Sequence, residues 1–235
     1  MTIVEPYDRI RVIVTDDDAF TRDAIAELLG NDAAISVDST FSDGAEMLAA
    51  VEPLGREAVK NIDVILCDIS MPEVGGIEAT LRLRAAGVRV PIILLTSFDS
   101  EENLIQALAA GANGYLIKTA DVVQIRSAID AVLSGTAVIS PDAAGFGATI
   151  THEPAASANP AEEMAQLGLT DREEGVLYLL CQGLSNHEIA RKLDIREGTV
   201  KVHVTSIMRK FNVRSRLELV VEAFNSGIVS PEGVH

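Results

Sequence analysis

Five polar side chains follow four apolar runs in the first half of this 235-residue chain. Asp16 and Asp17 come after the first run, Asp68 after the second, Thr96 after the third and Lys118 after the fourth. In an open parallel sheet the carboxyl ends of the strands collect at one edge, so we expect these groups to converge there. Three carboxylates, a hydroxyl and an ammonium group are suited to hold one Mg²⁺ ion and one phosphoryl group.

The three carboxylates would repel one another if they stood together without a cation, and a bound Mg²⁺ ion removes that penalty. Mg²⁺ prefers hard oxygen ligands and keeps several waters, so two carboxylates and a backbone carbonyl suffice. We therefore predict that Asp68 is a nucleophile that forms an aspartyl phosphate, with Lys118 and Thr96 neutralising the phosphoryl oxygens.

The segments that must position these groups alternate between two patterns. Strand-like runs lie at 10–15, 35–40, 62–67, 91–95 and 114–117, and helix-like runs lie at 19–29, 45–51, 77–86, 101–110 and 122–133. Short apolar strands that alternate with helices are typical of a sheet covered on both faces. The pattern predicts an α/β doubly wound, five-stranded parallel sheet of the flavodoxin type.

The rest of the chain has a different character. Residues 141–167 are rich in Ala, Gly and Pro without a sustained periodicity, which predicts a flexible linker. Thr170 and Ser185 then each begin a capping box, and helices are expected at about 171–182, 186–193, 197–211 and 216–225. A short helix, a turn and a longer basic helix are typical of a helix-turn-helix, so residues 168–228 should form a small all-α four-helix domain.

The net charge of −16 is unevenly distributed. Residues 1–164 carry 26 acidic and 10 basic side chains, whereas residues 165–235 carry 9 of each. Between positions 185 and 216, 8 basic side chains outnumber 3 acidic ones. An acidic half and a locally basic segment indicate different partners, and the basic segment favours nucleic acid.

Residues 8–140 resemble the receiver domain of bacterial two-component systems. The matching text is Asp16-Asp17-Asp18 with Arg22 after it, Cys67-Asp68-Ile-Ser70-Met-Pro72, Leu95-Thr96-Ser97 and Tyr115-Leu-Ile-Lys118. The resemblance implies that Asp17 and Asp68 bind Mg²⁺ directly and that Ser70 contributes its backbone carbonyl. It implies that Asp16 acts mainly through a metal-bound water.

The same resemblance implies a switch and a partner. Thr96 would move toward the phosphate, and the ring of Tyr115 would turn inward behind it. A sensor histidine kinase would donate the phosphoryl group to Asp68. The receiver would catalyse only its own phosphoryl transfer and dephosphorylation, so we do not expect an enzyme that acts on an external substrate.

Residues 168–228 resemble the output domain of the NarL/FixJ regulators, a LuxR-type helix-turn-helix. The matching text is Leu169-Thr170-Asp-Arg172-Glu173, Gly183-Leu-Ser185-Asn186-His-Glu188-Ile189-Ala190, Gly198-Thr199-Val200-Lys201-Val-His203 and Lys210-Phe-Asn-Val213. The resemblance implies that the third helix enters the major groove of double-stranded DNA. The expected contacts are bases for Lys201 and Val204, with His203 nearby, and phosphates for Thr199, Arg209 and Lys210.

Two features of this domain have more than one interpretation. Arg196 stands where the family usually places a Ser N-cap, whose loss costs about 0.5–2 kcal/mol. Thr199 or backbone contacts would compensate, or Arg196 would contact DNA instead. The apolar stripe of the last helix either closes the four-helix core or also forms the dimer contact that the resemblance implies. Its residues are Leu217, Val220, Val221 and Phe224. A homodimer, when phosphorylated or DNA-bound, would then bind inverted half-sites.

The leading hypothesis is a phosphorylation-switched, DNA-binding transcription regulator. No apolar stretch is long enough to span a bilayer and no signal-peptide pattern is evident, so we expect a cytoplasmic protein without a membrane partner. Two alternatives stay open. Asp16 and Asp18 fit the Asp-x-Asp pattern of Mg²⁺-dependent phosphohydrolases of the haloacid-dehalogenase type, although no cap domain is evident. A receiver that works without phosphate, as a dimerisation module, is the other alternative.

Overall fold

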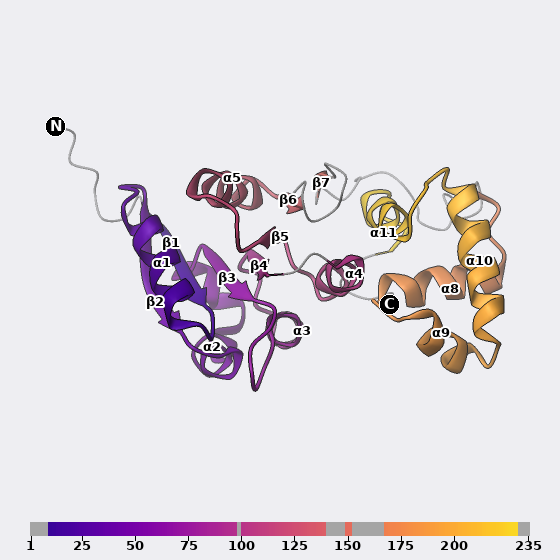
Figure 1. Cartoon of the computed structure of the whole chain (residues 1–235), viewed down its shortest axis with the longest axis horizontal. Coiled ribbons are helices and arrows are strands. Elements are labelled where there is room, and N and C mark those ends of the chain that lie inside the picture. The colour runs from indigo at the N-terminus through magenta and orange to yellow at the C-terminus, as the bar shows by residue number, and fades with distance from the viewer. Residues whose placement is uncertain (1–8, 98–99, 140–148, 152–166, 230–235) are drawn as a thin grey trace. The chain divides into compact units, whose positions relative to one another are not determined.

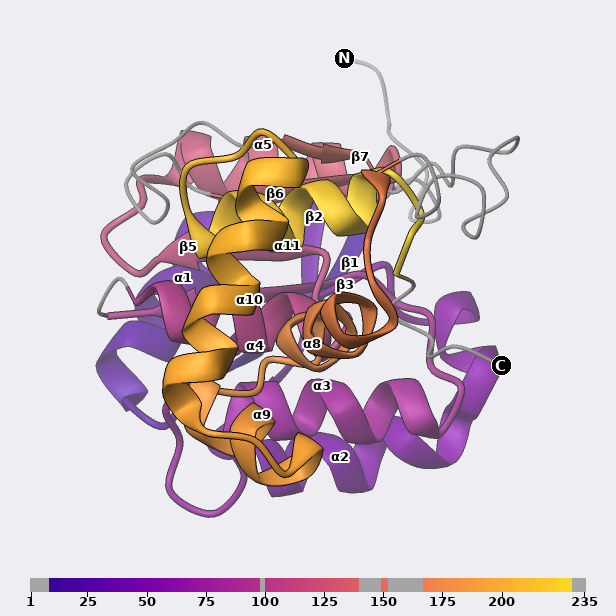
Figure 2. The ribbon, with the colours of Figure 1, turned by 90° about the vertical axis from the view of Figure 1, so that its right-hand side faces the viewer.

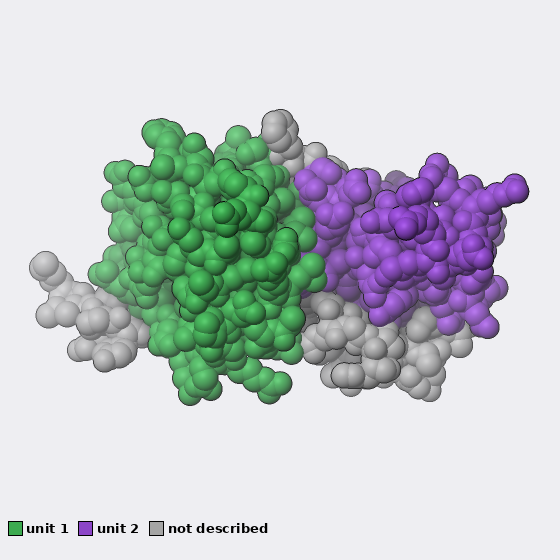
Figure 3. Space-filling view, turned by 90° about the horizontal axis from the view of Figure 1, so that it is seen from below, with its two compact units in different colours: residues 1–98, 112–134 green, residues 99–111, 135–235 purple. Residues whose placement is uncertain are grey.

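The computed structural model describes residues 9–97, 100–139, 149–151 and 167–229. The chain divides into two compact units, coloured separately in Figure 3, and Figure 1 labels their helices and strands. Unit 1 comprises residues 1–98 and 112–134, and unit 2 comprises residues 99–111 and 135–235. Within the described ranges, the helices are too short or too polar to cross a membrane.

Unit 1 is built on five parallel strands. They are β1 (Ile10–Thr15), β2 (Ile35–Phe41), β3 (Val64–Asp68), β4 (Ile92–Thr96) and β5 (Gly114–Ile117). Their order in the sheet is β2-β1-β3-β4-β5. Every residue of β3 and β4 is buried, which explains why both strands are almost wholly apolar. The doubly wound parallel sheet predicted from the sequence is confirmed.

The described helices of unit 1 are α1 (Ala19–Gly30), α2 (Gly44–Val51), α3 (Gly76–Ala85) and α5 (Val122–Leu133). Three of them begin at a side-chain cap, whereas the N-cap of α3 is Gly75, which has no side chain to accept a hydrogen bond. The carboxylates of Asp18, Asp43 and Asp121 accept hydrogen bonds from the first turns of α1, α2 and α5. A 3₁₀ helix, η1 (Glu52–Lys60), follows α2 in a stretch where the sequence pattern indicated neither a helix nor a strand.

Strand β3 begins two residues later than expected because Asp63 has another role. Its carboxylate accepts hydrogen bonds from the backbone N–H of Arg11 at 2.8 Å and from the Arg11 guanidinium at 2.9 and 3.0 Å. These bonds hold the pKa of Asp63 below its ordinary value against the opposing effect of burial. The ion pair ties the start of β3 to β1, its neighbour in the sheet.

Unit 2 contains one helix from the middle of the chain together with its C-terminal part. Its elements are α4 (Glu101–Ala109), β6 (Thr136–Ile139), β7 (Thr149–Thr151), α8 (Asp171–Cys181), α9 (Asn186–Leu193), α10 (Glu197–Lys210) and α11 (Arg216–Asn225). Strands β6 and β7 pair antiparallel, with Thr136 opposite Thr151. β7 lies inside the predicted linker 141–167 and was not expected; the linker's other residues, apart from residue 167, lie outside the described ranges.

Helix α10 packs against α8 and α9 (Figures 1 and 2). Val176 and Leu180 of α8, Val200 and Ile207 of α10 and Val220 of α11 are fully buried. The capping boxes predicted at Thr170 and Ser185 are confirmed. Each hydroxyl accepts a hydrogen bond from the backbone N–H of the Glu three residues later, and the carboxylate of that Glu accepts one from the backbone N–H of the capping residue.

The last helix closes this core. Leu217, Val220 and Val221 of α11 are buried, and Phe224 is half-buried. The core interpretation of the apolar stripe is therefore confirmed for three of its four residues, while its role in a dimer stays a prediction.

Arg196 is the N-cap of α10 but provides no side-chain cap. Only its backbone carbonyl takes part, accepting from the N–H groups of Thr199 at 2.8 Å and Val200 at 3.2 Å. The first turn of α10 therefore lacks the side-chain acceptor that Thr170 and Ser185 give to α8 and α9.

Replacing Arg196 with Ser should stabilise the chain, because a Ser hydroxyl at this extended backbone position can accept from a free N–H of α10. We expect the free energy of unfolding to rise by about 0.5–2 kcal/mol in urea titrations. Arg196→Ala is the control, since it removes the same charge without supplying an acceptor. An equal gain in both variants would contradict the capping explanation.

An ion pair joins the start of α8 to the end of α10. Glu173 of α8 is 5 % exposed, and its Oε2 lies 2.6 Å from Nζ of Lys210 at the end of α10. The Lys210 ammonium also donates to the Gly168 carbonyl at 2.5 Å. Burial alone would raise the pKa of Glu173, but hydrogen bonds from Lys210, Thr170 and Ser206 outweigh it and lower the pKa to about 2.

The stability of unit 2 should therefore depend on pH through Glu173. Its folded pKa of about 2 lies below the ordinary value of 4.5, so the stabilisation is complete above pH 4.5 and is lost as the pH falls toward 2. Glu173→Gln should remove this part of the pH dependence. At neutral pH it should lower the free energy of unfolding by on the order of 3 kcal/mol, because Lys210 loses its counter-charge.

The matched control for that titration is Glu188→Gln. Glu188 occupies the same place in the capping box of α9, but it is exposed and no lysine ion pair is found for it among the described residues. Denaturant midpoints measured from pH 2 to 7 compare the two. If Glu188→Gln lost as much stability as Glu173→Gln, the capping box and not the ion pair with Lys210 would account for the pH dependence.

Candidate functional site

The three carboxylates predicted to converge do so at the carboxyl edge of the sheet in unit 1. Asp16 and Asp17 follow β1 and Asp68 ends β3, and one carboxylate oxygen of each lies within 4.8 Å of the others. Asp16 and Asp68 are buried, at 0 % and 2 % exposure, whereas Asp17 is exposed. The cluster therefore has two buried anionic groups and one that faces solvent.

Lys118 neutralises the buried pair. Its Nζ lies 2.7 Å from Oδ2 of Asp16 and 2.9 Å from Oδ2 of Asp68. Its backbone N–H donates to the carbonyl of Thr96 at 2.7 Å, which fixes the residue at the ends of β4 and β5. Burial alone would lower the pKa of Lys118, but the bonds to Asp16 and Asp68 raise it above its ordinary value.

The surroundings of Asp68 disfavour its charged form. Burial raises its pKa above the ordinary value, and the hydrogen bond from Lys118 offsets only part of that effect. The backbone N–H of Ser70 also contributes a hydrogen bond to Asp68. A buried carboxylate at an open edge, next to a lysine and a backbone donor, has the surroundings of a nucleophile that receives an anionic group.

Neighbouring residues hold Asp16 in place, and the side chain of Asp18 has a different role. Arg22 Nη1 donates to the backbone carbonyl of Asp16 at 2.7 Å, and the Asp18 N–H donates to Oδ1 of Asp16 at 3.0 Å. The Asp18 carboxylate instead caps α1 by accepting from Thr21 at 2.7 Å, and this bond lowers its pKa. Asp18 is thus used for helix capping, which disfavours the Asp16-x-Asp18 arrangement of a phosphohydrolase.

The two predicted switch residues share a face of the sheet. Thr96 on β4 is 4 % exposed and Tyr115 on β5 is fully buried. Leu94 pairs with Tyr115 and Thr96 pairs with Ile117, so the side chains of Thr96 and Tyr115 project to the same side from neighbouring strands. The ring of Tyr115 is in an inward position in this structure.

The loop after Asp68 turns back tightly onto its own start. The N–H of Gly76 donates to the Ile69 carbonyl at 3.0 Å. A Cβ at Gly76 would lie 2.3 Å from the carbonyl oxygen of Asp68, so a larger residue cannot occupy this position without moving the backbone. Ser70, whose backbone carbonyl is a predicted metal ligand, lies inside this turn and is exposed. The oxygen-rich, anionic donor set fits Mg²⁺.

In unit 2, the exposed face of α10 presents the basic residues. Lys201, Val202, Thr205, Ser206 and Arg209 line one shallow surface depression. Lys201 also pairs with Glu197 at 2.9 Å on the same exposed face. Thr199 is exposed and His203 is half-buried.

One predicted DNA contact needs correction. Val204 is 8 % exposed and belongs to the core with Val200 and Ile207, so its predicted contact with bases is wrong. The ammonium of Lys210 forms an ion pair with buried Glu173 and so supports the fold of unit 2, while its contact with phosphate stays a prediction.

Val202 is an exposed apolar residue of α10 that the sequence prediction did not single out. It is 67 % exposed, although it is apolar and lies in the middle of α10. The signal was available in the helical periodicity, because positions 200, 204 and 207 share the buried face and position 202 does not.

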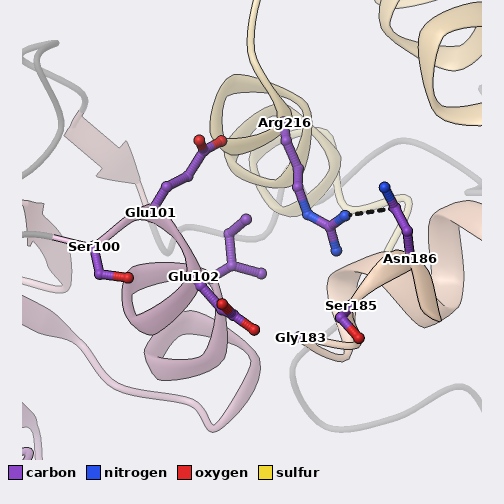
Figure 4. A pocket seen from close by; sticks show the side chains of 8 residues that line it. Ser100, Glu101, Glu102, Gly183, Ser185, Asn186 and Arg216 are labelled. Atoms are coloured by element: carbon purple, nitrogen blue, oxygen red, sulfur yellow. Dashed lines mark hydrogen bonds between the residues drawn. The ribbon is translucent and has the colours of Figure 1, made fainter. Parts of the chain in front are cut away.

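Unit 2 also contains a cavity of about 380 Å³, lined by α4, the turn before α9 and the start of α11 (Figure 4). The backbone N–H of Leu217 donates to Oε1 of Glu101 at 2.8 Å. The neighbouring guanidinium of Arg216 donates to the Leu184 carbonyl at 2.5 Å and to Oδ1 of Asn186 at 2.9 Å. Burial lowers the pKa of Arg216, and Glu101 and Glu102 partly offset this. An acidic side chain of α4 thus caps the first turn of α11.

Comparisons with known proteins divide the chain into two parts as well, but they place α4 in the first part and not with the C-terminal helices. Residues 12–130 match the family model of the response regulator receiver domain, and residues 167–223 match that of the bacterial regulatory proteins of the luxR family. The nitrate/nitrite response regulator protein NarP of Escherichia coli (strain K12) is 35 % identical over 218 residues, 90 % of this chain and 93 % of that protein. The transcriptional regulatory protein LnrK of Bacillus subtilis (strain 168) is 34 % identical over 222 residues, 93 % of this chain and 98 % of that protein.

Two solved structures share the fold. A two-component response regulator of the LuxR family from Aurantimonas sp. SI85-9A1 has a TM-score of 0.52 at 29 % identity, over 58 % of this chain and 94 % of that one. A response regulator RcsB–DNA complex has a TM-score of 0.52 at 20 % identity, over 94 % of this chain and 100 % of that one. With an acidic pocket closed by Lys118 and a helix-turn-helix in one polypeptide, the chain belongs to the NarL/FixJ family of two-component response regulators, which are phosphorylation-dependent, DNA-binding regulators of transcription.

Proposed function

We propose that this chain accepts a phosphoryl group on Asp68 from a sensor histidine kinase and that the aspartyl phosphate controls the binding of a homodimer to DNA. The observation that carries this proposal is the position of Lys118, whose ammonium joins two buried carboxylates at the open edge of the sheet. Such a lysine can follow the charge as it moves from the carboxylate to the phosphoryl oxygens, because it already lies within hydrogen-bonding distance.

The geometry suggests how the transfer proceeds. Lys118 holds Oδ2 of Asp68, which leaves Oδ1 as the oxygen that attacks phosphorus. The new O–P bond forms as the N–P bond to the kinase histidine breaks, and the imidazole nitrogen takes up a proton from solvent. The Ser70 N–H and the Lys118 ammonium then stabilise the charge on the transferred group.

Asp17, Asp68 and the backbone carbonyl of Ser70 would hold Mg²⁺, with Asp16 acting through a water. When bound, the ion supplies positive charge that neutralises phosphoryl oxygens. Asp17 is the only exposed carboxylate of the three, so it suits the outer side of the site, where the ion enters from solvent.

The path from the phosphate to the output helices follows the chain from Thr96 to α4. Thr96 ends β4, and Ser100, four positions later, is the N-cap of α4. We propose that inward movement of Thr96 shifts the start of α4 and weakens the cap that Glu101 gives to α11. The phosphate must favour the released arrangement by a few kcal/mol for this population shift to matter.

DNA binding uses the exposed face of α10. Lys201 reaches base edges as a hydrogen-bond donor, and the Val202 side chain suits an apolar contact with the methyl group of thymine. Thr199 and Arg209 are placed to contact phosphates, with His203 beside them. Each phosphate contact makes the affinity depend on salt.

The test of the proposal is phosphorylation of the full chain with acetyl phosphate and Mg²⁺, read by intact-mass spectrometry. We expect one phosphate adduct in the wild type and none in Asp68→Asn, because the amide cannot act as the nucleophile. Gel shifts with duplexes selected from a random-sequence library should show tighter binding after phosphorylation. Lys201→Ala should take up phosphate normally but bind DNA weakly; an adduct that persists in Asp68→Asn would disprove the assignment.

The role of α4 has its own test. Glu101→Gln weakens the cap on Leu217 by removing the charge of the acceptor, so the unphosphorylated chain should bind DNA about tenfold more tightly. Glu102→Gln is the matched control, because Glu102 lines the same cavity and is not the acceptor for Leu217. The increase should persist when Asp68→Asn is added. Equal effects in the two glutamine variants would point to general charge removal and contradict the cap.

A further inference from the structure

We propose that Asp43, at the turn between β2 and α2, is a positioning residue for the metal-binding loop after Asp68. The proposal rests on the proposed function, since it concerns the loop that carries Ser70. Oδ2 of Asp43 accepts a hydrogen bond from the backbone N–H of Glu73 at 3.2 Å, although the two residues are 30 positions apart. Oδ1 of the same carboxylate accepts from Ala45 at 2.7 Å and so caps α2. One side chain therefore ties the loop to the start of α2.

The residue after Asp43 brings the two segments into direct contact. A Cβ at Gly44 would lie 2.2 Å from the carbonyl oxygen of Val74 and 3.3 Å from Cε of Met71, so a side chain there would push the loop away. Met71 and Val74 are both buried, at 8 % and 7 % exposure. Helices α2 and α3 lie side by side, as Figure 2 shows, and the loop enters α3 from this contact.

The loop is therefore held at two points. At its base, Gly76 bonds to Ile69 directly beside Asp68. At its far end, Glu73 and Val74 are held by Asp43 and Gly44. Ser70 lies between the two points, and its exposed side chain adds little packing of its own. The direction of the Ser70 carbonyl is thus set by the two ends of the loop, and Asp43 supplies the polar part of the outer end.

Asp43 has no contact with Asp68 or Lys118 among the described interactions, so it acts on the site through the backbone of the loop. Loss of the tie should weaken the binding of Mg²⁺ without changing the nucleophile or its lysine. Groups that orient metal ligands typically change metal affinity by 10–100-fold when they are removed. We place Asp43 at the lower end, about tenfold, because it orients one carbonyl through three intervening residues.

Asp43→Asn is the decisive variant. Asn caps helices as well as Asp does, so α2 keeps its cap through Oδ1. The other side-chain atom becomes an NH₂ donor that faces the N–H donor of Glu73, and the tie is lost. Asp121→Asn is the matched control, because Asp121 caps α5 in the same unit with the same chemistry and loses the same charge.

The experiment uses the full unphosphorylated chain and has two measurements. Calorimetric titration with Mg²⁺ gives the dissociation constant, and amide hydrogen exchange without metal reports on the Glu73 N–H. We expect about tenfold weaker Mg²⁺ binding and faster Glu73 exchange in Asp43→Asn, and neither change in Asp121→Asn. At saturating Mg²⁺ the rate of phosphorylation by acetyl phosphate should match the wild type, whereas the half-saturating Mg²⁺ concentration should rise.

Three outcomes would overturn the proposal. One is an unchanged Mg²⁺ affinity in Asp43→Asn despite faster Glu73 exchange. The second is an equal loss of affinity in Asp121→Asn. The third is a loss that disappears at 0.5 M salt, because a long-range charge effect is screened whereas a positional effect is not. Failure of the proposed function is distinguishable, since the wild type would then bind Mg²⁺ without forming the Asp68 adduct.

Discussion

The ammonium group of Lys118 is the interaction on which the pocket depends. Asp16 and Asp68 are both buried at the same edge of the sheet, and two carboxylates in such surroundings cannot both stay ionised without a counter-charge. Lys118 reaches both with one nitrogen, at 2.7 and 2.9 Å. The requirement propagates into the sheet, since β1, β3 and β5 must end in register for the three groups to meet. The hydrogen bond from the backbone N–H of Lys118 to the carbonyl of Thr96 also connects this lysine to the end of β4, the strand that carries a predicted switch residue.

The loop after Asp68 follows from a second constraint, the close approach of backbones. Glycines at positions 44 and 76 allow carbonyl oxygens to lie where a Cβ would otherwise stand. Backbone contacts and two hydrogen bonds therefore set the shape of the loop, and its exposed side chains contribute little to it. This division suits the proposed function, in which the site would bind and release an ion and a phosphoryl group without refolding.

The sequence predicted most of unit 1 because its strands are short apolar runs that end in polar residues. It predicted α8 and α9 because Thr170 and Ser185 carry both halves of a capping box. It did not predict the β6–β7 pair, since the partner strand is only three residues long and its pairing is set by tertiary contact. The sequence also did not predict that α4 groups with the output helices, because a hydrogen bond between residues 116 positions apart leaves no local sequence pattern.

The errors on α10 have one physical origin. In a helix that packs on one face and binds on the other, the position of a residue around the helix axis decides which face it occupies. The sequence prediction assigned residues to DNA contacts by their type and did not use this position. Val204 is buried although its neighbours are polar, while Val202 is exposed although it is apolar. Lys210 lies at the end of the helix, where its ammonium pairs with the buried carboxylate of Glu173, a contact that residue type alone does not indicate.

The division of α11 constrains how the family's dimer could form here. Leu217, Val220 and Val221 are already buried in the bundle, and the N–H of Leu217 is capped by Glu101. A second copy could therefore meet α11 only on its remaining face, which includes half-buried Phe224 and exposed Glu222.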